Sequence, residues 1–419
     1  MILAAFRVRS FRFQWPADLL TSWAFEMETI ILGWYVMVHT GSVLLLTVFG
    51  SLQFLGTLAA PMFGVLGDRV GARLMLCAMR AIYAVLAVLV MTLALAGLLT
   101  PAWVFVAATL SGLFRPNDLV MRNSLIGGTI PPPHRVGALG MSRATMDSAR
   151  VGGALAGAGL STVLGIGHTY VFVTTFYLAS LALTFGVARA RPVPDPTLPL
   201  AGERGSRDWR ELREGLAHVV RTPQLLAAMW LAFLINLTAY PVSGGLLPYV
   251  AQRIYHVDAA GLGWLVASFS SGALLASIAM VLTGGPRHPG RFTLIHTGIW
   301  YALLLGFGHL QSMRAGVLVL LAAGFVQSVA MISMAATLLA AAGDGFRGRV
   351  MGVRTLAVYG LPLGLMASGA LIPRVGYPLT VTIYAAVGLL FTLLIGIRWR
   401  ASMWRRPRPA RPASVPQRV

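Results

Sequence analysis

The chain has 419 residues, of which 57% are hydrophobic and 11% are charged, and its mean hydropathy is +0.75. This composition excludes a soluble globular protein. A formal net charge of +20 would suit a nucleic-acid-binding protein, but the charges lie in short gaps between apolar segments and in the C-terminal tail. We therefore attribute them to a membrane and expect no nucleic-acid partner.

Hydropathy predicts twelve segments long enough to cross a lipid bilayer. They cover residues 17–38, 42–66, 74–98, 101–126, 137–164, 169–188, 223–250, 260–283, 292–310, 314–341, 349–373 and 377–398. A helix satisfies its own backbone hydrogen bonds in lipid, and the segments are too uniformly apolar for a barrel. The predicted fold class is therefore an all-α integral membrane protein.

The longest polar stretch divides these segments into two sets of six. We predict an N-terminal bundle over residues 1–188, a cytoplasmic linker with a short amphipathic helix over 189–222, a C-terminal bundle over 223–398, and a disordered cytoplasmic tail over 399–419. Most arginines flank one side of the predicted spans, and only Arg253, Arg314 and Arg374 lie in loops on the other side. The positive-inside rule then places both termini in the cytoplasm, with the protein in the plasma (inner) membrane.

A short charged loop lies between the second and third segments, with the sequence Gly64-Val-Leu-Gly-Asp68-Arg69-Val-Gly71-Ala-Arg73. Its glycines permit a sharp turn. The pattern resembles the loop between helices 2 and 3 of the major facilitator superfamily of transporters. The resemblance implies two pseudo-symmetric six-helix bundles and a conformational switch made by Gly64, Asp68, Arg69, Gly71, Arg73 and Asp118. The alternative interpretation is a cytoplasmic loop whose arginines only obey the positive-inside rule.

In that family the loop aspartate contacts the start of helix 11. The resemblance therefore implies that Asp68 lies beside the N-terminus of this helix, just after Arg349. We also expect Asp118 to contact Arg69 or Arg73. Further stretches, among them Gly33-Trp-Tyr-Val36 and Ala149-Arg-Val-Gly152, resemble the drug:proton antiporter branch with its siderophore and macrolide exporters. Members of that branch usually carry Gly-Pro in helix 5, whereas here Gly153 precedes an alanine.

Two glutamates of the first segment, Glu26 and Glu28, lie near the middle of the bilayer. An ionisable group at that depth costs about 2.5–3.5 kcal/mol and is a functional candidate by default. Their spacing sends the two side chains to nearly opposite sides of a helix, so we expect one to face the central cavity. Burial disfavours an ionised carboxyl and a nearby arginine favours it. We predict that one of the pair carries the coupling proton, with Asp147 as the reserve candidate.

Charged residues also recur in the fourth and fifth segments. They are Arg115, Asp118, Arg122, Arg143, Asp147 and Arg150. Mutual neutralisation between packed helices is one interpretation, and contact with substrate is the other. The second half has one such charge, Arg354. The predicted substrate-cavity residues are Arg115, Arg150, Gln53, Asn236, Gln327 and Tyr359.

We find no catalytic, metal-binding or phosphate-binding pattern, so we expect no enzyme activity, metal or cofactor. The leading prediction is a monomeric secondary active transporter that exports an amphiphilic small molecule, such as a drug, antibiotic or siderophore, by alternating access coupled to protons. A symporter or facilitator that imports a nutrient is the first alternative. A non-transporting membrane receptor or scaffold is the second.

Overall fold

The computed structural model describes residues 2–57, 70–188, 204–343 and 346–404, and all regular structure within these ranges is helical. The predicted all-α class is therefore confirmed. Seven helices of the described part are long and apolar enough to cross a membrane. The chain is accordingly a multi-pass membrane protein.

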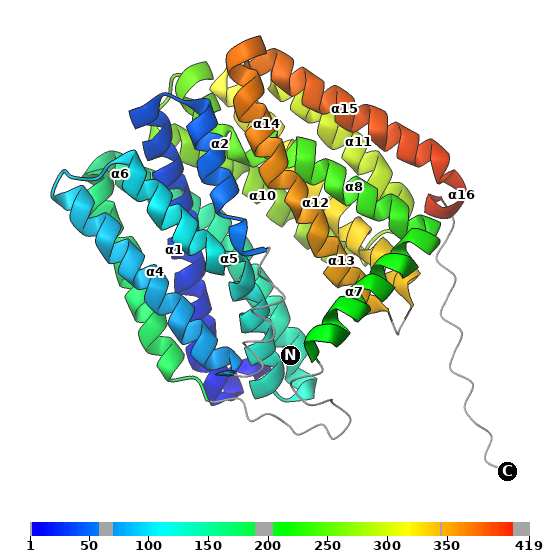
Figure 1. Cartoon of the computed structure of the whole chain (residues 1–419), viewed down its shortest axis with the longest axis horizontal. Coiled ribbons are helices and arrows are strands. Elements are labelled where there is room, and N and C mark those ends of the chain that lie inside the picture. Colours follow the sequence, from blue (N-terminus) through cyan, green and yellow to red (C-terminus); the bar gives the residue numbers. More distant parts are fainter. Residues whose placement is uncertain (1, 58–69, 189–203, 344–345, 405–419) are drawn as a thin grey trace.

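The N-terminal half forms one bundle, drawn in blue to teal in Figure 1. Its elements are η1 (Ile2–Arg7), α1 (Arg9–Thr40), α2 (Val43–Leu52), η2 (Leu55–Thr57), α4 (Ala72–Leu95), α5 (Pro101–Thr129) and α6 (Pro132–Phe185). Helix α6 contains two predicted spans, which we expected to be joined by a loop. The structure instead joins them at Gly165, whose φ of 77° is a conformation that glycine adopts without steric cost.

The C-terminal half forms the second bundle, drawn in green to red in Figure 1. Its elements are α7 (Arg204–Arg221), α8 (Pro223–Tyr240), η3 (Pro241–Gly245), α9 (Leu247–Tyr249), η4 (Val250–Ile254), α10 (Ala259–Thr283), α11 (Pro289–Phe307), α12 (Met313–Ala342), α13 (Arg347–Leu356), η5 (Ala357–Tyr359), α14 (Gly360–Val375), α15 (Tyr377–Arg398) and α16 (Arg400–Met403). The predicted span 223–250 lies within one long helical stretch, Pro223–Ile254. Its hydrogen-bond pattern changes from α to π at Pro241, because a proline cannot donate a backbone hydrogen bond.

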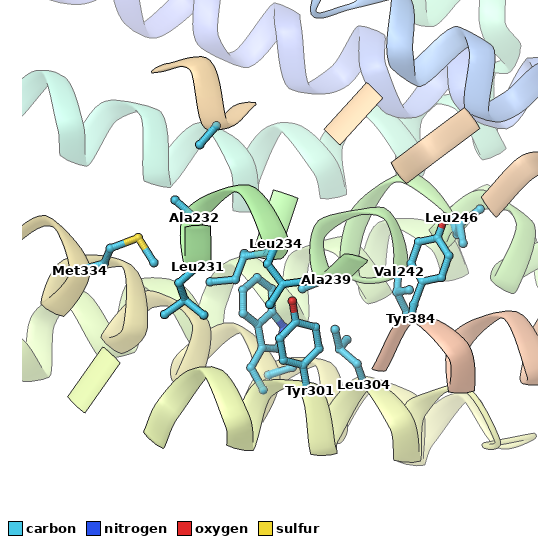
Figure 2. Close-up of a cluster of buried hydrophobic side chains, with 14 of the residues drawn as sticks. Leu231, Ala232, Leu234, Ala239, Val242, Leu246, Tyr301, Leu304, Met334 and Tyr384 are labelled. Carbon is cyan, nitrogen blue, oxygen red and sulfur yellow. The ribbon is translucent and has the colours of Figure 1, made fainter. Parts of the chain in front are cut away.

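Each bundle has an apolar core of its own, and Figure 2 shows part of the C-terminal one. Leu231 and Leu234 of α8 face Tyr301 of α11 and Met334 of α12 in this cluster. The hydroxyl groups of Tyr301 and Thr238 are 2.7 Å apart and hydrogen-bonded, which satisfies the polar end of a buried ring.

The two bundles meet along two helix pairs, α2 with α14 and α6 with α10. Small residues permit the close approach: a Cβ at Gly369 would lie 2.0 Å from Oγ1 of Thr47, and a Cβ at Gly263 would lie 2.6 Å from Cβ of Ala158. These contacts lie toward the end of the molecule that carries the α1–α2 turn at Gly41. We call this the Gly41 end, and the opposite end, where α4 begins, the Gly71 end. Close packing through small residues is typical of membrane helices.

Candidate functional site

Two aspartates and two arginines form a charge cluster inside the N-terminal bundle. Asp18 of α1 accepts a hydrogen bond from Arg80 of α4 and lies 3.6 Å from Nε of Arg122 in α5. Arg122 also pairs with Asp118, one turn earlier on its own helix. All four side chains are at most 3% exposed. Because two positive and two negative charges compensate each other, the cluster joins three helices without leaving net charge in the bundle.

Sequence reasoning selected Asp118 for another role and missed Asp18 and Arg80. Arg80 lies well inside the predicted span 74–98, so the depth rule that selected Glu26 and Glu28 would have found it. Asp18 lies at the start of the span 17–38, where depth gives no signal. The cluster favours the interpretation of mutual neutralisation for Asp118.

Half of the predicted conformational switch lies outside the described residues, namely Gly64, Asp68 and Arg69. Gly71 precedes α4 with a φ of 93°, which agrees with the turn expected there. Arg73 donates from Nη2 to the backbone oxygen of Phe185 at 2.5 Å. The expected contact between Arg73 and Asp118 is therefore not formed, and the roles of Asp68 and Arg69 stay predictions.

Glu28 lies inside the N-terminal bundle, between α1 and the second part of α6. Its carboxylate accepts hydrogen bonds from the hydroxyl groups of Tyr177, at 2.8 Å, and Tyr170, at 3.4 Å. The residue is buried, and Arg115 is within electrostatic range. Glu28 is therefore held by protein groups.

Glu26 lies at the junction of the two bundles. Its Oε1 is 3.8 Å from Nε of Arg150 in α6, and 48% of the Arg150 side chain is exposed. Arg150 is also within electrostatic range of Tyr240 in α8 of the other bundle. The two glutamates separate in this way because residues two apart on a helix point about 160° away from each other at about 3.6 residues per turn.

Arg115 is held by neutral groups. It donates from Nη1 to Oε1 of Gln53 and from Nη2 to the backbone oxygen of Phe25, both at 2.6 Å, and its guanidinium lies over the Phe25 ring. No carboxylate of the described residues is within ion-pair distance. The predicted cavity residues Arg115 and Gln53 therefore contact each other, and the positive charge has no direct counter-ion.

A second polar group surrounds Tyr240 of the C-terminal bundle. Gln327 of α12 donates from Nε2 to the Tyr240 hydroxyl oxygen at 2.8 Å. Arg354 of α13 is within electrostatic range of Tyr240, and so are Arg143 and Arg150 of α6. The structure thus brings the predicted residues Gln327 and Arg150 near one tyrosine that sequence reasoning missed, since a tyrosine in an apolar segment carries no distinguishing signal.

The remaining predicted residues are placed less centrally. Asn236 donates to the backbone oxygen of Ala232 on its own helix at 2.9 Å, and Tyr359 is partly buried in η5. Asp147 lies 3.5 Å from Arg143 on α6. Asp147 is therefore close to the Tyr240 group through its arginine partner.

A distinct pocket of about 220 Å³ lies at the Gly41 end, away from all these charges. Its lining residues are Ile31, Trp34, Ser161, Thr162, Gly165, Ile166, Asp258 and Ala259. The carboxylate of Asp258 already accepts a hydrogen bond from the backbone of Gly261 at 2.9 Å, where it caps α10. We therefore take the charged junction between the bundles, and not this pocket, as the candidate site.

Comparison with known proteins identifies the architecture. A family model described as Major Facilitator Superfamily matches residues 15–362, whereas the search of curated proteins found no match. Among solved structures, a peptide transporter POT in complex with alafosfalin is similar, with 12% identity, a TM-score of 0.75 and coverage of 96% of each chain. The human organic anion transporter MFSD10 has 16% identity and a TM-score of 0.62 over 92% of this chain and 99% of its own.

A bacterial homologue of the human lysosomal transporter Spinster, in an inward-facing and unoccupied conformation, is also similar. It has 15% identity and a TM-score of 0.64, over 94% of this chain and 96% of its own. At such identities the comparisons establish the shared fold.

Proposed function

Because the chain belongs to the Major Facilitator Superfamily, we propose that it is a secondary active transporter that exports an amphiphilic small molecule by alternating access, coupled to protons. The similar structures are those of transporters for peptides and for organic anions, so the fold supports solute transport without selecting a solute. Export is proposed from the motifs that resemble the drug:proton antiporter branch.

One observation carries the proposal of proton coupling, namely the pair of Glu26 and Arg150 at the junction of the bundles. A carboxylate there can exchange its proton with water while it lies beside a moving solute. Protonation of Glu26 would remove its attraction for Arg150 and change the charge that the N-terminal bundle presents to Tyr240. Glu28 is the second candidate and Asp147 the third.

Alternating access is supported by the contacts between the bundles. The closest cross-bundle approaches at the helix pairs α2–α14 and α6–α10 lie toward the Gly41 end. At the Tyr240 group, by contrast, the Arg143 side chain is 62% exposed. We propose that the two bundles rock about the central site, which is the general mechanism of such repeats.

The experiment uses proteoliposomes that contain a dextran-linked pH dye. Rhodamine 6G and sulforhodamine B, two dyes with related ring systems and opposite net charge, are added outside as test solutes. In an antiporter, entry of a solute moves protons out and makes the lumen alkaline. Glu26→Gln should abolish this proton movement but retain solute exchange. Asp258→Asn, a matched carboxylate-to-amide change that keeps the cap of α10, should behave like the wild type.

Symport is the second candidate. The ion pair of Glu26 and Arg150 favours it when the solute is an anion. An anion that binds Arg150 in place of Glu26 would promote protonation of that glutamate. Solute and proton would then bind together. Acidification of the lumen on solute entry would support symport and contradict antiport. Transport without any proton movement would contradict both, and no transport of any solute would favour a receptor or scaffold.

We also propose that the protein resides in the plasma (inner) membrane as a monomer with both termini cytoplasmic. The proposal rests on the excess of arginine at the Gly71 end. Its test is a C-terminal fusion to a reporter that is active only in the cytoplasm. A signal from a reporter that works only outside would contradict this orientation.

A further inference from the structure

Arg354 of α13 is a partly buried arginine at the junction of the bundles. Its guanidinium group makes no hydrogen bond or ion pair with any residue in the described ranges. A charged group of the other bundle within electrostatic range of it is another arginine, Arg143 of α6, and Tyr240 is within the same range. Two like charges are therefore held near Tyr240, and no carboxylate of the described residues is bound to Arg354.

We propose that an oxyanion of the transported solute (a carboxylate, sulfonate or phosphate) binds between Arg354, Arg143 and Tyr240. This inference rests on the proposed function only in that solute passes through this site. It names the solute class as amphiphilic organic anions.

The donors at this site are suited to an oxyanion. The guanidinium group presents several N–H donors in a fixed fork that matches the geometry of a carboxylate or sulfonate. Gln327 donates a hydrogen bond to the hydroxyl oxygen of Tyr240. The hydroxyl hydrogen of Tyr240 therefore remains available to donate to a ligand. Arg143 contacts Asp147 through Nε, which leaves its terminal amino groups for a ligand.

Charges elsewhere at the junction favour an anion over a cation. Among the described residues at the junction, Arg143, Arg150 and Arg354 contribute positive charge, and Glu26 and Asp147 contribute negative charge. Both carboxylates already have an arginine partner. A cationic solute would have to compete with those arginines, whereas an anion would find Arg354 unpaired.

Apolar side chains of both bundles are available to contact an apolar group of the same solute. Met331 is one turn after Gln327 on α12 and partly buried, so it lies on the same side of that helix. On the opposite bundle, Trp23 packs over Gly152 of α6. An anion between Arg354 and Arg143 would also remove their repulsion, which allows the bundles to approach each other at this level.

The test measures equilibrium binding, without any gradient, to the purified full-length protein in phosphatidylcholine nanodiscs. Fluorescence anisotropy is recorded with sulforhodamine B and rhodamine 6G. We expect the anionic dye to bind more tightly, and Arg354→Gln to weaken its binding about tenfold, the scale of loss of a charged hydrogen-bond partner in a site. Arg354→Lys should be intermediate. Arg314→Gln, an exposed arginine at the start of α12, is the matched control and should bind like the wild type.

A second variant, Tyr240→Phe, removes one donor at constant shape and should weaken binding several-fold. Thermal unfolding of each variant checks that it is folded. Equal or tighter binding of rhodamine 6G, wild-type affinity in Arg354→Gln, or no binding of sulforhodamine B, 1-naphthylacetate and naphthalene-1-sulfonate would each overturn the proposal. So would displacement of the dye by phosphatidylglycerol in the nanodiscs, because that result assigns the site to a lipid headgroup.

These outcomes are independent of proton coupling. A protein that binds the anion but moves no protons would contradict the proposed coupling alone. A protein that moves protons with a cationic dye alone would contradict the anion proposal.

Discussion

Arg80 of α4 donates a hydrogen bond to Asp18 of α1 in the interior of the N-terminal bundle, where the arginine is 0% exposed and the aspartate 2%. The two residues are far apart in the chain, and both belong to helices that are otherwise apolar. Their pairing ties α1 to α4 through the interior of the bundle, because a buried charge without a partner would be costly.

We expect Asp18→Asn to reduce the free energy of unfolding by about 3–5 kcal/mol, because it leaves Arg80 buried without a full counter-charge. Thermal unfolding of the purified protein in detergent measures the effect. Asp147→Asn is the matched control, and its partner Arg143 is largely exposed, so it should cost about 0–1 kcal/mol. Equal unfolding midpoints of Asp18→Asn and wild type would contradict the prediction.

The pair of Glu26 and Arg150 predicts how the charge at position 26 affects binding of an anion. Glu26→Gln removes the carboxylate that competes for Arg150, so this variant should bind sulforhodamine B several-fold more tightly than the wild type in the same buffer. Thermal unfolding checks that the variant is folded. Wild-type affinity in Glu26→Gln would show that the anion does not compete with Glu26 for Arg150.

The glycine contacts between the bundles predict a conformational effect. Gly263→Leu would force α10 away from Ala158 of α6 and so favour the state in which the Gly41 end is open. If the bundles move as rigid bodies, the other contact between them should open too. Thr47→Cys in a Cys77→Ser background reports this opening, and we expect its maleimide labelling to become several-fold faster.

The control for this experiment is Gly298→Leu on α11, where a Cβ would meet no atom within 4 Å. Labelling of Thr47→Cys should be unchanged in that variant. Unchanged labelling in Gly263→Leu as well would show that the two helix pairs move independently.

The contacts of Arg115 predict that its shape matters as well as its charge. Arg115→Lys keeps the charge, but an ammonium group cannot contact Gln53 and the Phe25 backbone in the same geometry. We expect a several-fold lower rate of solute exchange in proteoliposomes with an unchanged thermal midpoint. Thr29→Val, which removes a 3.4 Å contact to Gln53, should have a smaller effect. Wild-type exchange in Arg115→Lys would show that charge alone suffices.

Several features of the site depend on spacing along one helix, and these could be predicted. The separation of Glu26 from Glu28 follows from the helical repeat, and the positions of Arg115, Arg150 and Gln327 in long apolar segments made them candidates by depth. The pairing of Arg143 with Asp147 is likewise local, since residues four apart are neighbours on a helix. The partners of these residues on other helices were not predictable in this way.

The amino-acid sequence by itself determined that this is a helical membrane protein with two halves, because long apolar segments have no other stable state in lipid. Tertiary structure alone decided which charges meet. Asp18 pairs with Arg80, and Glu28 accepts a hydrogen bond from Tyr177. Arg354 comes within electrostatic range of Arg143. All three relationships arise from the packing of helices that are distant in the chain. Periodicity reports the side of a helix on which a residue lies, but the residue opposite depends on how the helices are arranged around it.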